Sequence, residues 1–84
     1  MDVQVGKIIH YYDKIGVAVV LVKNMPLTVR DRIKISGHDV EFTQAVGSLQ
    51  IDHADVDVVS PGMEAGMKVD QPVKAGDMVF QIPK

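Results

Sequence analysis

The chain has 84 residues, of which 46% are hydrophobic and 24% charged, with a formal net charge of −2 and no cysteine. One domain over residues 1–84 is expected, because two halves could not each bury a core, and disulfides and thiolate metal sites are excluded. The charge argues against a sequence-independent nucleic-acid binder. With no signal peptide and no apolar run of about 20 residues, we expect a soluble cytosolic protein without membrane contact.

The whole chain is rich in valine, which favours β-strands. A strand is expected over Val3–Tyr12, followed by a turn at 13–16. Val17–Val22 is apolar at every position, which predicts a strand covered on both faces or lying at a barrel seam. Pro26 interrupts pairing because it has no N–H. The alternation in Arg32–Ile35 predicts a strand with one buried face.

The segment from Val40 to Ile51 changes its apolar phase. Inward positions have even numbers up to Val46 and odd numbers from Leu49 onward. A shift of one residue moves every side chain to the opposite face of a strand. A bend or bulge at Gly47 keeps the apolar side inward, and barrels need such corners to close.

Short strands are expected near 57–59, 67–69 and 78–82, after a connection at 36–39. In the last strand, Met78, Phe80 and Ile82 share one face. We expect Met78, Val79, Phe80 and Ile82 to close the barrel; a rival interpretation is that this strand pairs with another chain. Strands this short, with frequent turn signals between them, predict an all-β fold. We predict a small closed antiparallel β-barrel of about six or seven strands.

Two segments of the chain resemble each other. Pro26–Ile33 and Pro72–Val79 each contain a proline, a few residues, an aspartate and then a strand. The similarity predicts two turns of the same kind, each leading into a strand, and it does not indicate a repeat architecture.

The ordered set of segments 5–8, 16–20, 48–53 and 66–77 resembles the second, β-barrel domain of the elongation factor Tu family over nearly the whole chain. The ending is also similar to the small C-terminal domain of the collagenase-like peptidases. The first resemblance implies a barrel that contacts RNA or ribosomal partners. Since the GTPase that accompanies this barrel in its larger relatives is missing, it implies a binding role.

One position departs from the family pattern. Arg30 stands before Asp31, where the family has glycine. If the backbone there needs a positive φ, a residue with a side chain costs on the order of 1 kcal/mol.

No catalytic constellation is visible. The serines do not lie in a Gly-x-Ser-x-Gly elbow. The glycines of segment 62–68 lack the spacing of a phosphate loop and are expected to serve a turn. We therefore expect no enzyme activity, no bound nucleotide and no cofactor.

A metal site is not indicated either. The histidines His10, His38 and His53 lack the short spacing of zinc ligands. The acidic run 52–57 lacks the glycine and the terminal glutamate of a calcium loop. Because valines alternate with its last two aspartates, a solvated strand face explains this run better.

A basic stripe is the feature most suggestive of binding. Arg30, Arg32 and Lys34 lie two residues apart, so on a strand they share one face, while Ile33 and Ile35 face the other way. Three cations would give weak, salt-sensitive RNA binding. A plain solvated face, or an edge strand charged to prevent aggregation, is the simpler explanation of the stripe.

Two functions remain open. The first is a non-catalytic binding module, RNA- or ribosome-associated and translation-related, that uses this stripe. The alternative is a protein–protein adaptor that corresponds to a detached domain of a larger enzyme. A contiguous positive patch favours the first, and an exposed apolar patch the second.

Overall fold

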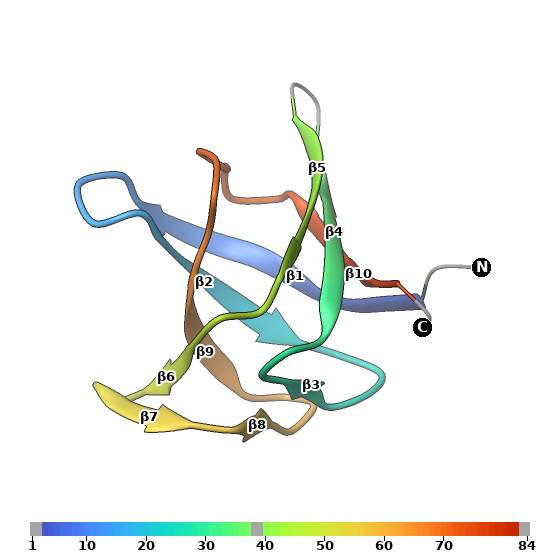
Figure 1. The fold of residues 1–84 in the computed structure, drawn as a ribbon, viewed down its shortest axis with the longest axis vertical. Helices are drawn as coiled ribbons and strands as arrows, with labels where there is room; N and C mark the ends of the chain where they lie inside the picture. Colours follow the sequence, from blue (N-terminus) through green and yellow to red (C-terminus); the bar gives the residue numbers. More distant parts are fainter. Residues whose placement is uncertain (1–2, 38–39, 83–84) are drawn as a thin grey trace.

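The computed structural model describes residues 3–37 and 40–82. This part of the chain contains ten β-strands and no helix, which confirms the all-β class, and so no helix there is long and apolar enough to cross a membrane (Figure 1). In chain order the strands are β1 (Val3–Tyr12), β2 (Val17–Val22), β3 (Leu27–Thr28), β4 (Arg32–Ser36), β5 (Glu41–Ala45), β6 (Leu49–Ile51), β7 (Ala54–Val56), β8 (Val58–Val59), β9 (Glu64–Lys68) and β10 (Met78–Gln81).

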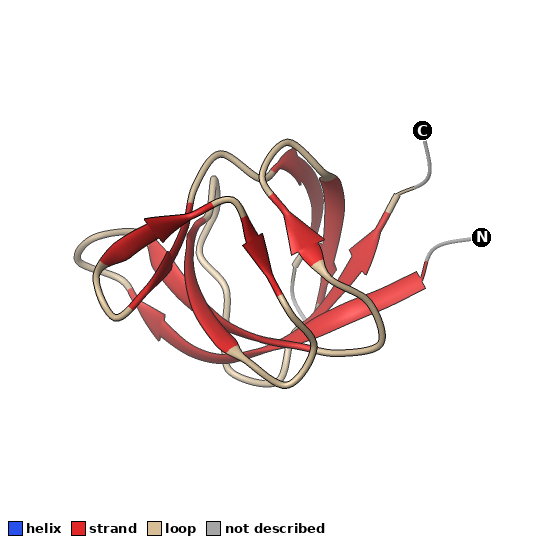
Figure 2. Ribbon diagram, turned by 90° about the horizontal axis from the view of Figure 1, so that it is seen from below, coloured by secondary structure: helices blue, strands red, loops and turns tan. Residues whose placement is uncertain are grey.

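All strand pairs are antiparallel. Eight strands form one sheet in the order β5-β4-β10-β1-β2-β9-β6-β7, and β3 pairs with β8 in a second, two-stranded sheet. The larger sheet curls around the interior (Figure 2). Its end strands β5 and β7 do not pair with each other in the described residues, so the predicted closed barrel is not confirmed.

The strand count exceeds the prediction of about six or seven because very short strands were missed. β3 has two residues and β7 has three, and the bent segment forms two strands, β5 and β6; β8 is the strand expected near 57–59. β9 begins at Glu64, ahead of the predicted start at Met67, and contains Gly66. The expectation that the glycines of 62–68 serve a turn therefore holds only for Gly62, which has a φ of 92°.

The chain links the two ends of the large sheet through a bend at 46–48, as the change of apolar phase predicts. β5 buries its even-numbered residues, and Val46 and Leu49 on either side of the bend are both buried. Figure 1 shows the chain continuing from β5 across the molecule into β6. Gly47 meets open space at this point, so a side chain would not collide there.

One buried polar side chain joins β5 to the chain that follows β9. Gln44 is 4% exposed. Its Nε2 donates to the carbonyl of Lys68 at 2.9 Å, and its Oε1 accepts from the backbone N–H of Asp70 at 2.8 Å. The amide group thus satisfies one donor and one acceptor of a neighbouring main chain, as a paired strand would do.

The first aspartate turn spans residues 28–31. The N–H of Asp31 donates to the Thr28 carbonyl, and the Asp31 carboxylate accepts from the Thr28 N–H at 3.1 Å. Arg30, the third residue, has a φ of 82°. The turn also exchanges two backbone hydrogen bonds with Val46, from the Arg30 N–H and to the Asp31 carbonyl, each 2.8 Å long.

The second aspartate turn, residues 74–77, repeats this arrangement. The Asp77 carboxylate accepts from the Lys74 N–H at 2.9 Å, and Gly76 has a φ of 102°. Here the two exchanged backbone hydrogen bonds go to Ile8, at 2.7 and 2.8 Å. The prediction of two turns of one kind is confirmed, and they lead into β4 and β10, which pair with each other.

Candidate interaction surfaces

Two of the three predicted basic residues lie on one strand face. Arg32 is exposed and Lys34 half-buried on the outer side of β4, while Ile33 and Ile35 are fully buried. Arg30 is exposed in the turn that precedes β4, so it is not part of the strand. The stripe therefore consists of two cations on one face of β4, and a strained turn places the third cation, Arg30, next to them.

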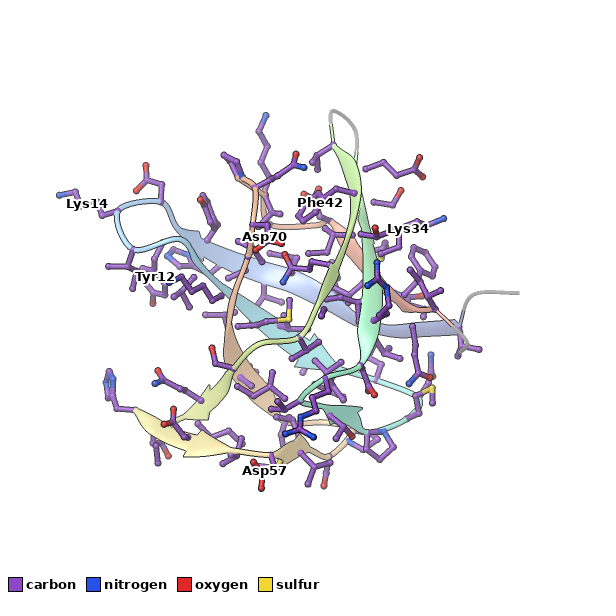
Figure 3. All side chains as sticks on the ribbon, in the orientation of Figure 1. Tyr12, Lys14, Lys34, Phe42, Asp57 and Asp70 are labelled. Atoms are coloured by element: carbon purple, nitrogen blue, oxygen red, sulfur yellow. The ribbon has the colours of Figure 1, made fainter. Side chains whose placement is uncertain are left out.

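Lys34 lies against an aromatic ring that the stripe prediction did not include. Its Nζ is 5.7 Å from the ring centroid of Phe80, its register partner on β10, and 3.8 Å from Oε1 of Glu41. Figure 3 shows the Lys34 side chain on the outside of β4. Because both charged groups are solvent-accessible, the ion pair contributes little stability, but the cation and ring together form an amphipathic outer patch.

β10 buries Val79 and turns the residues on either side of it outward. Met78 and Phe80 do share one face, but it is the outer one, and Val79 between them is fully buried. The Nε2 of Gln4 on β1 lies 3.0 Å from the Met78 sulfur on this outer surface. The prediction that Met78 and Phe80 share one face is confirmed, and of the residues expected to close the barrel, Val79 supplies the core contact of β10.

The acidic run lies elsewhere, on β6 to β8. Asp52 and His53 form the connection between β6 and β7 with φ values of 51° and 66°. The carboxylate of Asp55 accepts from Gln50 at 3.0 Å, and Asp57 lies beside β8 (Figure 3). In residues 3–37 and 40–82, no group of three histidine, aspartate or glutamate side chains could hold a metal ion. His38 falls outside these ranges.

An open groove runs between the end of β4 and segment 71–78. Its most buried polar group is Asp77, which is 7% exposed. One carboxylate oxygen accepts from the Lys74 N–H, and the carboxylate packs so closely on Gly37 that a Cβ there would collide with it. Asp77 thus has a structural role in its turn, which is the same role that Asp31 has in the first turn.

Comparisons with known proteins identify others that share this fold. No protein-family model matches the chain. An uncharacterized protease of Methanocaldococcus jannaschii is 30% identical over 79 residues, which is 93% of this chain but only 19% of the length of that protein.

Two crystal structures of the C-terminal domain of a Geobacillus thermoleovorans protein assigned to the U32 peptidases share the fold. One, a selenomethionine variant, has a TM-score of 0.84 and 22% identity over 90% of this chain and 95% of that domain. The other has a TM-score of 0.88 and 20% identity over 98% and 93%. The resemblance to the peptidase C-terminal domain is thus confirmed for the fold, and the resemblance to elongation factor Tu finds no support.

Proposed function

We propose that this chain is a non-catalytic binding domain, equivalent to the C-terminal domain of a U32 peptidase, and that its partner is a protein. The observation that carries the proposal is the match of nearly the whole chain to nearly the whole of a separable C-terminal domain. The 30% identity to a protease that is about five times longer supports it. We place the domain in the cytoplasm, because it has no cysteine.

A domain replacement tests this proposal. The Methanocaldococcus jannaschii protease is prepared intact, without its matched segment, and with this chain in place of that segment. We expect the replacement to recover thermal stability and peptide hydrolysis that the deletion loses, while the isolated chain hydrolyses nothing. Hydrolysis by the isolated chain would refute the non-catalytic role. A replacement that behaves like the deletion would refute equivalence to the peptidase domain.

RNA binding is a second candidate function, favoured by one arrangement. Arg32 and Lys34 project from the same face of β4, with the ring of Phe80 beside Lys34 and Arg30 in the adjacent turn. Cations beside a half-buried aromatic ring suit single-stranded nucleic acid, in which phosphates pair with cations and bases stack on rings. The proposed surface is therefore the outer face of β4 and β10.

A salt series separates this candidate from the first. Binding of a fluorescent single-stranded RNA is measured from low to physiological salt for the wild type and for an Arg30/Arg32/Lys34 triple-alanine variant. Loss of three phosphate contacts should reduce the slope of log K against log salt by about 2. A Lys23→Ala variant, whose lysine follows β2, is the control and should keep the wild-type slope. If the wild type does not bind at low salt, RNA is not the partner.

A further inference from the structure

The outer face of β2 is an apolar row that the described chain leaves half-covered. Val17, Val19 and Leu21 point outward and are half-buried, whereas the three alternate residues of β2 are fully buried. None of the three outward side chains packs against the hydrophobic core. The sequence predicts a strand covered on both faces or lying at a barrel seam, and the described residues cover only one face fully.

The strands on either side carry unlike residues at matching positions. Leu21 pairs with Lys7 on β1 and with Glu64 on β9. The next outward row consists of His10, Val19 and Gly66, and the one after it of Tyr12, Val17 and Lys68. Each row therefore has an aliphatic residue of β2 at its centre. On the β1 side it has a cation or an aromatic ring, and on the β9 side it has an anion, a glycine or a cation.

Gly66 lies inside β9, beside Val19 of the apolar row. Its φ is not positive, and an added Cβ would meet only the Val17 side chain at 3.3 Å and the Gln50 carbonyl at 3.9 Å. Glycine inside a strand weakens the strand and often marks the close approach of another molecule. The Val17 side chain of the apolar row already approaches this backbone, so a Cβ at Gly66 would require Val17 to shift by a few tenths of an ångström.

We propose that a second copy of this chain binds this face, about a two-fold axis that runs along β2. Such an axis exchanges the β1 and β9 sides, which makes the surface complementary to itself. Lys7 then faces Glu64 of the second copy. The His10 ring, which stacks edge-on with Tyr12 at 4.3 Å, covers the bare backbone of Gly66.

The remaining contacts fit the same axis. Tyr12 faces Lys68 of the second copy, an arrangement that suits a cation–aromatic contact. The apolar row of β2 packs on its own symmetry mate. No hydrogen bond or ion pair involves the side chains of Lys7, Glu64 or Lys68 in the described residues, so these groups have their charges available for a partner.

The interface is small, and the dimer is accordingly weak. Three strands about 4.8 Å apart, over about five residues each, give a contact of a few hundred Å² per copy. Stable interfaces bury about 800 Å² per partner. We therefore expect a reversible dimer that forms at high protein concentration and dissociates in salt.

Charge reversal across the axis tests the proposal by sedimentation equilibrium at low salt. Lys7→Glu and Glu64→Lys each replace two attractive contacts with two repulsive ones, and each should weaken dimerisation about tenfold or more. The double variant K7E/E64K restores complementarity and should return the dissociation constant to within about threefold of the wild type. Asp57→Lys, on the distant acidic run, is the matched control and should dimerise normally.

A second measurement, chemical cross-linking, tests the dimer even if the charge-reversal variants fold poorly. Because the chain has no cysteine, Val19→Cys places one thiol on the proposed axis, and a short bismaleimide should link two copies rapidly. Thr43→Cys, on the outer face of β5, should link slowly. Monomer at all concentrations up to 1 mM, recovery absent in the double variant, or equal linking at both positions would overturn the proposal.

Discussion

Replacing Arg30 with glycine should stabilise the protein. Arg30 has a φ of 82°, and a left-handed conformation costs an L-residue about 1–2 kcal/mol. Glycine removes that cost but adds about 0.4–1 kcal/mol of unfolded-state entropy. The exposed Arg30 side chain makes no hydrogen bond or ion pair in residues 3–37 and 40–82, so no such contact is lost. The net gain should be about 0.5–1 kcal/mol, or roughly 3–6 °C in Tm for a domain of this size.

Urea unfolding followed by circular dichroism measures this difference, provided the m-values agree. Gly76→Ala in the equivalent turn is the matched control. An added Cβ at Gly76 meets no atom within 4 Å, and φ is 102°. Its cost is therefore that of the backbone alone, and the free energy of unfolding should fall by a similar amount. The explanation of both turns fails if R30G destabilises the protein or if G76A leaves the stability unchanged.

Two further substitutions test the packing of this fold in the same assay. Gln44→Leu should cost about 1–3 kcal/mol, because it leaves the Lys68 carbonyl and the Asp70 N–H without their partner; an unchanged midpoint would mean that water replaces the amide. Gly37→Ala should cost about 1–3 kcal/mol, because the Asp77 carboxylate must move away from the new methyl group. A neutral Gly37→Ala would show that this loop adjusts freely.

The parts of the fold that follow from local pattern were predictable. The alternation of Arg32–Ile35 fixes which side of β4 is buried, since a charged residue cannot take the inner positions. The change of phase between Val46 and Leu49 locates the bend in the same way. The two aspartate turns followed from similar spacing of proline and aspartate, together with the anomaly at Arg30.

Other parts depend on which strands become neighbours. In β10 every position is apolar except Gln81, so the pattern gives the parity of Met78 and Phe80 but not the face that they occupy. Phe80 is outward because it pairs with Lys34, and that register is not encoded locally. For the same reason the sequence does not show that one face of β2 is only half-covered. Strands of two or three residues, such as β3, lack the length to show a period.

Arg30 links stability to binding in a way that further substitutions can separate. The second turn has glycine at the equivalent position, so the fold accepts glycine there, yet the first turn holds a strained cation next to β4. Strain of this kind persists at functional sites. Asn tolerates a positive φ without a charge, while Lys keeps both the charge and the strain. If the cation matters, R30N should gain stability and lose affinity for an anionic partner, whereas R30K should keep both near wild type. Equal affinity of R30N and wild type in the RNA salt series would show that the charge of Arg30 has no part in binding.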